Sequence, residues 1–331
     1  MRFADPRHVV LAFMLLALNV PVSGGVSAVV HQQRYAMGTM FDVIVFHHSR
    51  ADAMRVIEEA FTEIDRLERV MSHYRSDSDL SKLNREARHR AVRVDASLYE
   101  ILRDSIEFSR RSRGRFDVTI APLLRLWRAS ADDGHAPTPE AIAQARRCVG
   151  YEKIDLSGTD GIRFRSDCLE VDLGGIGKGY AVDRALGILT SAGIRRAMVN
   201  AGGSSISAVG APPGRNGWPV LLGEADAGGM VLLLDRQSVS TSQRDTSKRF
   251  GEIIDPLTGG PASRSHRVSV IAPTATTADA LSTTLLMLPM EEATVLLSAF
   301  PDVSAVWISP DGHKRVVFRE SRLRLQPSSH R

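Results

Sequence analysis

The chain has 331 residues, of which 43% are apolar and 24% are charged, and its formal net charge is +4. This composition is typical of a soluble globular protein, and the length is sufficient for a full hydrophobic core. The basic residues are spread along the chain and do not alternate with aromatic residues at stacking distances. Nucleic-acid binding is therefore not expected.

The first 28 residues have the pattern of a secretory signal peptide. Arg2 and Arg7 precede an apolar run from Val9 to Val20, and small residues follow it. The run is shorter than the roughly 20 residues that a membrane-spanning helix needs. We expect export through a general secretory route and a periplasmic location. Association with the inner membrane remains open, through an uncleaved signal or through a partner.

The remaining chain alternates between helical and extended patterns. The spacing of apolar residues predicts helices over residues 49–71, 95–112, 139–148, 180–192, 277–288 and 291–299. Asp77 or Ser78 is expected to cap a short helix after a polar loop. Extended patterns predict strands over residues 34–46, 162–164, 169–173, 196–201, 303–308 and 314–318, with further short strands between 204 and 241.

These elements do not follow a regular strand–helix–strand rhythm, and several strands are close enough in sequence to form hairpins. The pattern predicts an α+β fold with largely antiparallel sheets and packed helices. No linker divides the chain, so we expect a single compact domain over residues 32–322. The terminal residues 323–331 are expected to be disordered.

Two cysteines, Cys148 and Cys168, are the only ones in the chain. They could form a disulfide in an oxidising compartment, but spacing alone does not show whether they approach each other. Two buried free thiols are the favoured interpretation. Because the sequence contains no Cys/His cluster, a structural zinc site is not expected.

The stretch VDLGGIGKGYAVDRA, residues 171–185, is the strongest local signal. Asp172 precedes a series of glycines, and Lys178 lies just before a helix that is expected to begin near Tyr180. Glycines permit close backbone approach, and the N-terminus of a helix attracts anions. The pattern predicts a phosphate or pyrophosphate site, although a tight turn without a ligand is the alternative. It matches neither the Walker A motif nor the dinucleotide fingerprint.

A second candidate is the helical segment TTADALSTTLLML. Asp279 and Thr283 are four residues apart and therefore share one helix face. A carboxylate and a hydroxyl are ligands suited to a hard cation such as Mg²⁺. The alternatives are that Asp279 only caps the helix and that Thr283 bonds back to a carbonyl.

Eight segments occur in an order and spacing that resemble the ApbE family, the FAD:protein FMN transferases. They are YAMGT, MSHYRSDSDLSKLN, FDVTIAPLLRLW, VDLGGIGKGYAVD, NAGG, STS, IIDPLTG and VIAPTATTADALSTTLLML. The resemblance extends from Tyr35 to Leu288. It implies an α+β fold related to the T-fold group.

The resemblance also implies an activity. Members of this family are exported, flavin-binding and Mg²⁺-dependent. They cleave FAD at its pyrophosphate and transfer FMN to a Ser or Thr hydroxyl of an acceptor protein that carries a flavinylation-type motif, with release of AMP. Some relatives hydrolyse FAD to FMN and AMP.

Matching positions imply the roles of individual residues. The expected flavin- or FAD-contacting residues are Met37, Tyr74, Phe116, Asp117, Asp172, Lys178 and Glu252. The expected metal ligands are the carbonyl of Gly175 and the side chains of Asp279 and Thr283. We expect Lys178 to hold pyrophosphate oxygens, and Asp255 or Glu252 to accept the proton of the acceptor hydroxyl.

Glu252 departs from the family pattern, because many relatives have a histidine at this position. The chain between Thr241 and Glu252 is also short for the family. A glutamate can act as a base but cannot donate as a histidinium does. Two alternatives to transfer therefore remain: an FAD pyrophosphatase and a flavin-binding protein without turnover.

Overall fold

A computed structural model describes residues 28–158, 161–223, 229–244, 250–262, 266–309, 315–320 and 323–325. The strands are β1 Ala28–Ala36, β2 Thr39–His47, β3 Ile154–Asp155, β4 Arg163–Phe164, β5 Ala197–Ala201, β6 Ser205–Val209, β7 Trp218–Leu222, β8 Met230–Leu234, β9 Gln237–Gln243, β10 Arg267–Ala272, β11 Ser304–Ile308 and β12 Arg315–Phe318. The helices are α1 Arg50–Met71, α2 Asp79–Glu86, α3 Ala96–Arg111, α4 Ala121–Asp133, α5 Pro139–Arg146, α6 Gly177–Ser191, α7 Ala275–Met287 and α8 Met290–Ser298.

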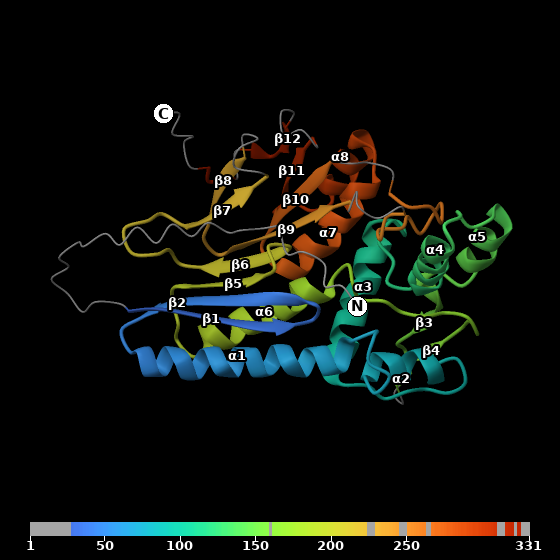
Figure 1. The fold of residues 1–331 in the computed structure, drawn as a ribbon, viewed down its shortest axis with the longest axis horizontal. Helices are drawn as coiled ribbons and strands as arrows, with labels where there is room; N and C mark the ends of the chain where they lie inside the picture. Colours follow the sequence, from blue (N-terminus) through green and yellow to red (C-terminus); the bar gives the residue numbers. More distant parts are fainter. Residues whose placement is uncertain are drawn as a thin grey trace.

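Within the described ranges, eight strands form one sheet in the order β1-β2-β5-β6-β9-β10-β11-β12 (Figure 1). Every neighbouring pair in this sheet is antiparallel. The pairs β3–β4 and β7–β8 are separate and also antiparallel. The predicted α+β fold with antiparallel sheets in one compact domain is confirmed.

Helices α1, α6 and α7 pack on the large sheet, with α6 between the other two (Figure 1). Helix α1 illustrates the cause, because its buried residues recur at three- and four-residue intervals and form one apolar face. The β7–β8 hairpin contributes Trp218, Val220 and Leu232 to a separate apolar cluster that includes Ile44 and Met198 of the large sheet. No helix in the described part of the chain is long and apolar enough to cross a bilayer.

The predicted strand over residues 34–46 is wrong, because the structure has a hairpin there. Strands β1 and β2 pair from Ala36↔Thr39 outward, and the turn between them consists of Met37 and Gly38. Both turn residues have positive φ, 50° and 77°, which is the backbone of a two-residue hairpin turn. Residues 1–27 of the expected signal peptide lie outside the described ranges, and Ala28 is the first residue of β1.

Two other boundaries differ from the prediction. Helix α6 begins at Gly177, three residues earlier than expected, because the carbonyl of Leu173 accepts from the N–H of Gly177 and closes the first turn. The expected strand over residues 169–173 is reduced to one bridge between Glu170 and Ile120. The side chain of Asn84 bonds both backbone groups of Val171, so this residue needs no strand partner.

The C-terminal segment was expected to be disordered from residue 323. In the structure Leu325 bridges Leu232 of β8, and the N–H of Leu233 donates to the carbonyl of Arg324. The expectation is therefore wrong for residues 323–325, because Arg324 and Leu325 pair with β8 and the N–H of Leu323 donates to the carbonyl of Glu320. Residues 326–331 lie outside the described ranges.

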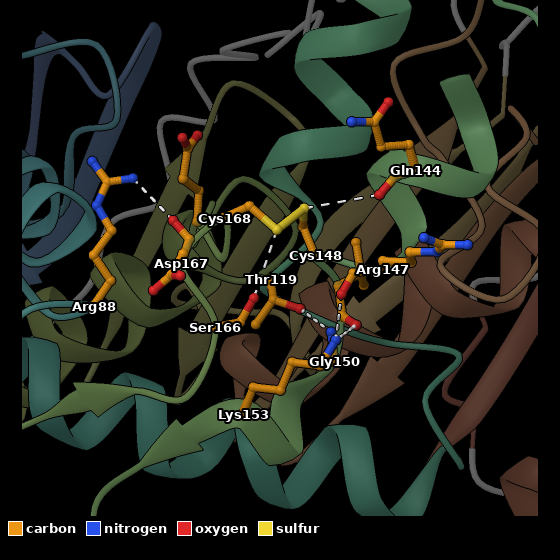
Figure 2. The surroundings of a disulfide bond; sticks show 12 residues. Arg88, Thr119, Gln144, Arg147, Cys148, Gly150, Lys153, Ser166, Asp167 and Cys168 are labelled. Carbon is orange, nitrogen blue, oxygen red and sulfur yellow. Dashed lines mark hydrogen bonds between the residues drawn. A yellow bond between two sulfur atoms is a disulfide. The ribbon is translucent and has the colours of Figure 1, made fainter. Parts of the chain in front are cut away.

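Cys148 and Cys168 form a disulfide, with their Cα atoms 5.2 Å apart (Figure 2). The favoured expectation of two free thiols is wrong. The antiparallel pair β3–β4 lies between the two cysteines in sequence, and the N–H of Arg165 donates to the carbonyl of Lys153. This pairing folds the chain back and brings positions 148 and 168 together, which linear spacing does not reveal.

Candidate functional site

One cavity of about 1270 Å³ collects almost all of the site residues predicted from the sequence. Its lining includes Met37, Tyr74, Phe116, Asp117, Asp172, Gly175, Lys178, Glu252, Asp279 and Thr283. Ligand pockets of small molecules commonly have volumes of about 300–1,000 Å³. The cavity is therefore large enough for a dinucleotide-sized ligand. Asp255 is the one predicted site residue that does not line it.

The glycine turn forms one wall of the cavity at the start of α6. Asp172 Oδ1 accepts a hydrogen bond of 2.7 Å from the N–H of Gly174, which fixes the turn. Because α6 begins at Gly177, Lys178 lies in its first helical turn. The preceding residue, Ile176, provides no side-chain cap. The N–H groups of Gly177 and Gly179 donate to the Leu173 carbonyl and to Asp279, so the attraction of this helix end for an anion comes from its positive dipole end and from Lys178, which lines the cavity.

Gly179 allows α6 and α7 to approach each other at this wall. A Cβ atom on Gly179 would lie 2.3 Å from the carbonyl oxygen of Ala275 and 2.8 Å from Cβ of Asp279. The N–H of Gly179 donates to Asp279 Oδ2 at 2.9 Å. The glycine turn and the α7 carboxylate, which are 100 residues apart in sequence, are thus in direct contact.

Asp279 lies inside α7, in its second turn. The expectation that it might only cap this helix is wrong, because Thr274 is the capping residue and its side chain accepts from the N–H of Thr277. The Asp279 side chain is only 4% exposed, and it lines the cavity together with Thr283 one turn further on. A Cβ atom on Gly175 would lie 3.5 Å from Thr283 Cγ2, so the turn also contacts this second position.

The oxygen groups at this contact are chemically suited to a hard cation. Asp279 supplies a carboxylate, Thr283 a hydroxyl and Gly175 a backbone carbonyl. Oxygen donors of this kind, completed by water and phosphate oxygens, are what Mg²⁺ prefers. No cluster of three or more His, Cys, Asp or Glu side chains that could hold a metal occurs in the residues described above. A metal here would therefore depend on this single carboxylate.

Asp117 has a structural position in the cavity lining next to the glycine turn, where the carbonyl of Val118 accepts from the N–H of Asp172 at 2.7 Å. Its Oδ1 accepts from the N–H and the hydroxyl of Thr119, at 2.8 and 2.7 Å, and its Oδ2 accepts from the N–H of Tyr151 at 2.9 Å. Burial raises the pKa of the Asp117 carboxyl. Asp117 thus holds the turn that places Phe116 beside Gly175, where a Cβ atom on Gly175 would lie 3.5 Å from Phe116 Cε2.

Tyr74 and Met37 border the cavity from two different loops. Tyr74 is 83% exposed, and the guanidinium carbon of Arg128 lies 5.8 Å from the centre of its ring. An exposed aromatic ring at a cavity edge is available for stacking on a planar ligand. Met37 reaches the cavity because it occupies the turn between β1 and β2.

The two candidate bases differ in position. Asp255 accepts from the N–H of Leu257 at 2.8 Å and forms an ion pair with Arg115 at 3.3 Å. Its carboxylate therefore stabilises the turn after residue 254, and the prediction of a catalytic Asp255 loses its structural support. Glu252 lines the cavity and remains the better-placed carboxylate.

The sequence analysis missed three contributors to the site. Asp183 of α6 accepts from the N–H groups of Ala275 and Thr276, both at 2.8 Å, and so fixes the start of α7. Arg128 lies in α4, a helix that the sequence analysis did not predict, and it carried no signal of its own. The β7–β8 hairpin adds an apolar edge to the cavity, and its members that line it are Pro219, Leu221, Leu222 and Val231. Of these three, only Asp183 could have been found from the sequence, because it is an acidic residue about one helical turn after the glycine-rich segment.

The fold and this cavity define an α+β protein in which the start of α6 contacts a buried carboxylate of α7 at the cavity wall. The ApbE family profile matches residues 37–307, and the chain belongs to the ApbE family. The FAD:protein FMN transferase of Treponema pallidum is 32% identical over 307 residues, covering 85% of this chain and 84% of that protein. The protein of the same name from Klebsiella pneumoniae is 31% identical over 281 residues, covering 78% of each.

Solved structures agree with this assignment. The flavin transferase ApbE from Vibrio cholerae superposes with a TM-score of 0.78 at 26% identity, covering 88% of this chain and 98% of that chain. The apo form of the Pseudomonas stutzeri flavinyl transferase ApbE gives a TM-score of 0.77, also at 26% identity, and covers 88% and 94% of the two chains.

Proposed function

We propose that this protein transfers the FMN moiety of FAD to a Ser or Thr hydroxyl of an acceptor protein, with release of AMP and with a requirement for Mg²⁺. The observation that carries the proposal is the direct contact between the glycine turn and α7, where the N–H of Gly179 donates to Asp279. In this contact, the positive end of α6 lies beside a buried carboxylate of a dinucleotide-sized cavity. Membership in a family of flavin transferases supports the same reaction.

Different residues bind the pyrophosphate, the flavin and the metal ion. The positive dipole end of α6 and the ammonium group of Lys178 hold the pyrophosphate by charge. Tyr74, Met37 and Phe116 provide apolar contact for the flavin. Gly175, Asp279 and Thr283 would hold Mg²⁺, which when bound neutralises charge on the pyrophosphate.

The transfer step balances without a redox partner. The oxygen of the acceptor hydroxyl forms a bond to the FMN-side phosphorus, and the bond from this phosphorus to the oxygen of AMP breaks. The hydroxyl proton passes to a carboxylate, for which Glu252 is the better-placed candidate because it lines the cavity. Lys178 and the positive dipole end of α6 stabilise the leaving phosphate by position and charge.

We further propose that the protein is exported to the periplasm. The N-terminal pattern of residues 1–28 motivates this proposal. The Cys148–Cys168 disulfide supports it, because disulfides persist in oxidising compartments. Association with the inner membrane would follow from an uncleaved signal or from a membrane-bound acceptor. Fractionation of cells that express the full chain, with N-terminal sequencing of the recovered protein, tests location and cleavage together.

The test of function combines the pure protein with FAD, Mg²⁺ and an acceptor that carries a flavinylation-type Ser/Thr motif. In-gel flavin fluorescence on the acceptor and a mass increase of one FMN are the expected results. Asp279→Ala should reduce transfer by at least about 100-fold, because the protein loses the carboxylate that would hold Mg²⁺ at the pyrophosphate. Transfer by Asp279→Ala at the wild-type rate, with an unchanged Mg²⁺ requirement, would contradict the assignment.

A matched pair of threonines controls for general damage to α7. Thr283→Ala should weaken Mg²⁺-dependent transfer, since Thr283 lines the cavity. Thr284→Ala should leave transfer unchanged, since Thr284 is buried and its hydroxyl donates to the carbonyl of Ala280 on the same helix. Equal losses in both variants would point to helix damage instead of a ligand role.

A second candidate function is FAD hydrolysis to FMN and AMP without an acceptor. The observation that favours it is Glu252, at the position where the family resemblance predicts a histidine. Release of FMN and AMP with no labelled acceptor identifies this activity. Recovery of intact bound FAD identifies a flavin-binding protein without turnover.

A further inference from the structure

The carboxylate of Asp279 receives hydrogen bonds from two different elements. One comes from the N–H of Gly179 in α6, and the other comes from the hydroxyl of Ser240 in β9, at 3.2 Å from Oδ1. We propose that Ser240 is a positioning residue that orients Asp279 toward a divalent cation. This inference rests on the proposed function, because it concerns the same carboxylate.

Ser240 is itself held firmly beneath α7. Its side chain is 1% exposed, and its hydroxyl lies 2.8 Å from the carbonyl of Ser204 and 3.1 Å from the hydroxyl of Ser205. A serine hydroxyl has one proton to donate and can accept two hydrogen bonds. Its proton is shared between the carbonyl of Ser204 at 2.8 Å and Asp279 Oδ1 at 3.2 Å, and the negative charge of the carboxylate favours the second acceptor although the first is nearer.

Two donors fix the plane of the Asp279 carboxylate and leave some of its acceptor positions unoccupied. An ionised carboxylate has about four acceptor positions on its two oxygens. Gly179 occupies one on Oδ2 and Ser240 occupies one on Oδ1. The remaining positions are available on the cavity side, because Asp279 lines the cavity. Without Ser240, the carboxylate would be held on one side only and could rotate away from the cation.

Ser238 provides a matched control on the same strand and the same face of β9. It is fully buried, and its hydroxyl pairs with that of Ser207 at 2.8 Å across β6. Ser238→Ala therefore removes a buried hydroxyl pair of the same kind, in the same sheet, without touching Asp279. Any general cost of deleting a buried serine hydroxyl from β9 appears in both variants.

The experiment titrates Mn²⁺ into the full-length protein, without FAD, and follows the electron paramagnetic resonance signal of the free ion. Ser240→Ala should bind Mn²⁺ about tenfold more weakly than wild type, the loss typical for a residue that orients a metal ligand. Ser238→Ala should bind as wild type does. In transfer assays, Ser240→Ala should need about tenfold more Mg²⁺ for half-maximal rate and should recover the wild-type rate at saturating Mg²⁺.

Each outcome decides the proposal. Wild-type Mn²⁺ affinity in Ser240→Ala overturns it, and so does an equal loss in Ser238→Ala. The failure of the proposed function gives a different result. If wild type transfers no FMN, but Ser240→Ala still binds Mn²⁺ more weakly than wild type, the proposed transferase activity is wrong and the positioning role of Ser240 stands. If wild type transfers FMN and Ser240→Ala has the same Mg²⁺ requirement, the proposed function stands and the positioning role of Ser240 is wrong.

Discussion

Gly179 is the residue at which α6 and α7 come closest. A side chain there would overlap the carbonyl of Ala275 and Cβ of Asp279. The sequence marked this glycine as part of an anion-binding turn. The structure gives it a further role, since the absence of a Cβ lets its N–H reach the Asp279 carboxylate.

Gly179→Ala should therefore destabilise the protein and weaken Mg²⁺-dependent transfer together. Overpacking of this kind costs about 1–3 kcal/mol of the free energy of unfolding. Gly187→Ala, in the same helix, is the control. A Cβ atom there meets nothing within 4 Å, so this variant should be as stable as wild type or up to about 1 kcal/mol more stable. Urea denaturation of wild type, Gly179→Ala and Gly187→Ala measures these stabilities. A Gly179→Ala midpoint equal to that of wild type would contradict the close approach of α6 and α7 at this residue.

Helix α1 is linked to α3 by a cluster of charged side chains. Arg66 donates to Glu63 within α1 and to Asp95, the capping residue of α3, at 2.9 Å. The hydrogen bond from Arg66 lowers the pKa of Glu63 below its ordinary value of 4.5. The Glu63 side chain is 13% exposed, so solvent screens this pair less than a fully exposed one.

This cluster predicts a pH dependence of stability. Because the folded state favours ionised Glu63, the stabilisation is fully present above pH 4.5 and is lost as pH falls through the lower pKa of the folded protein. Arg66→Met should lower the free energy of unfolding by about 1 kcal/mol at pH 7 and by progressively less below pH 4.5. Thermal unfolding of wild type and Arg66→Met between pH 3 and pH 7 measures the loss of stability and its dependence on pH.

Arg103→Met is the control for this pH series. Arg103 pairs only with its neighbour Asp104 on the exposed face of α3, among the described residues. Its replacement should change stability very little at any pH. A difference between wild type and Arg66→Met that stays constant from pH 3 to pH 7 would remove the assignment to the Glu63 carboxylate.

At the scale of the whole molecule, the disulfide connects two segments that lead into neighbouring parts of the cavity lining, the Asp117 turn and the glycine turn. Cys148 lies two residues before Gly150, whose N–H donates to the hydroxyl of Thr119 at 2.7 Å (Figure 2). Cys168 lies four residues before Asp172. The bond thus constrains both the Asp117 turn and the approach to the glycine turn.

Removal of this bond should cost stability and FAD affinity. A disulfide closing a loop of about this length contributes roughly 3 kcal/mol to the free energy of unfolding. The double variant Cys148→Ser/Cys168→Ser should therefore unfold at lower urea concentration and bind FAD more weakly. Dithiothreitol should reduce the stability of wild type but not that of the variant. Unchanged stability of wild type, with reduction verified by mass spectrometry, would oppose the prediction.

The sequence by itself determined the fold class, the helices with strong apolar periodicity, and the ordered motifs that resemble the ApbE family. These are local properties, since spacing along the chain fixes which residues share a helix face. It did not determine that Met37 occupies a hairpin turn, that Cys148 meets Cys168, or that Asp255 pairs with Arg115. Only the structure decided these. The two pairings join segments whose separation in sequence carries no information about their distance in space, and the turn became visible only when β1 was seen to pair with β2. The same reason applies to Ser240, whose hydroxyl became meaningful only when β9 was placed beneath α7.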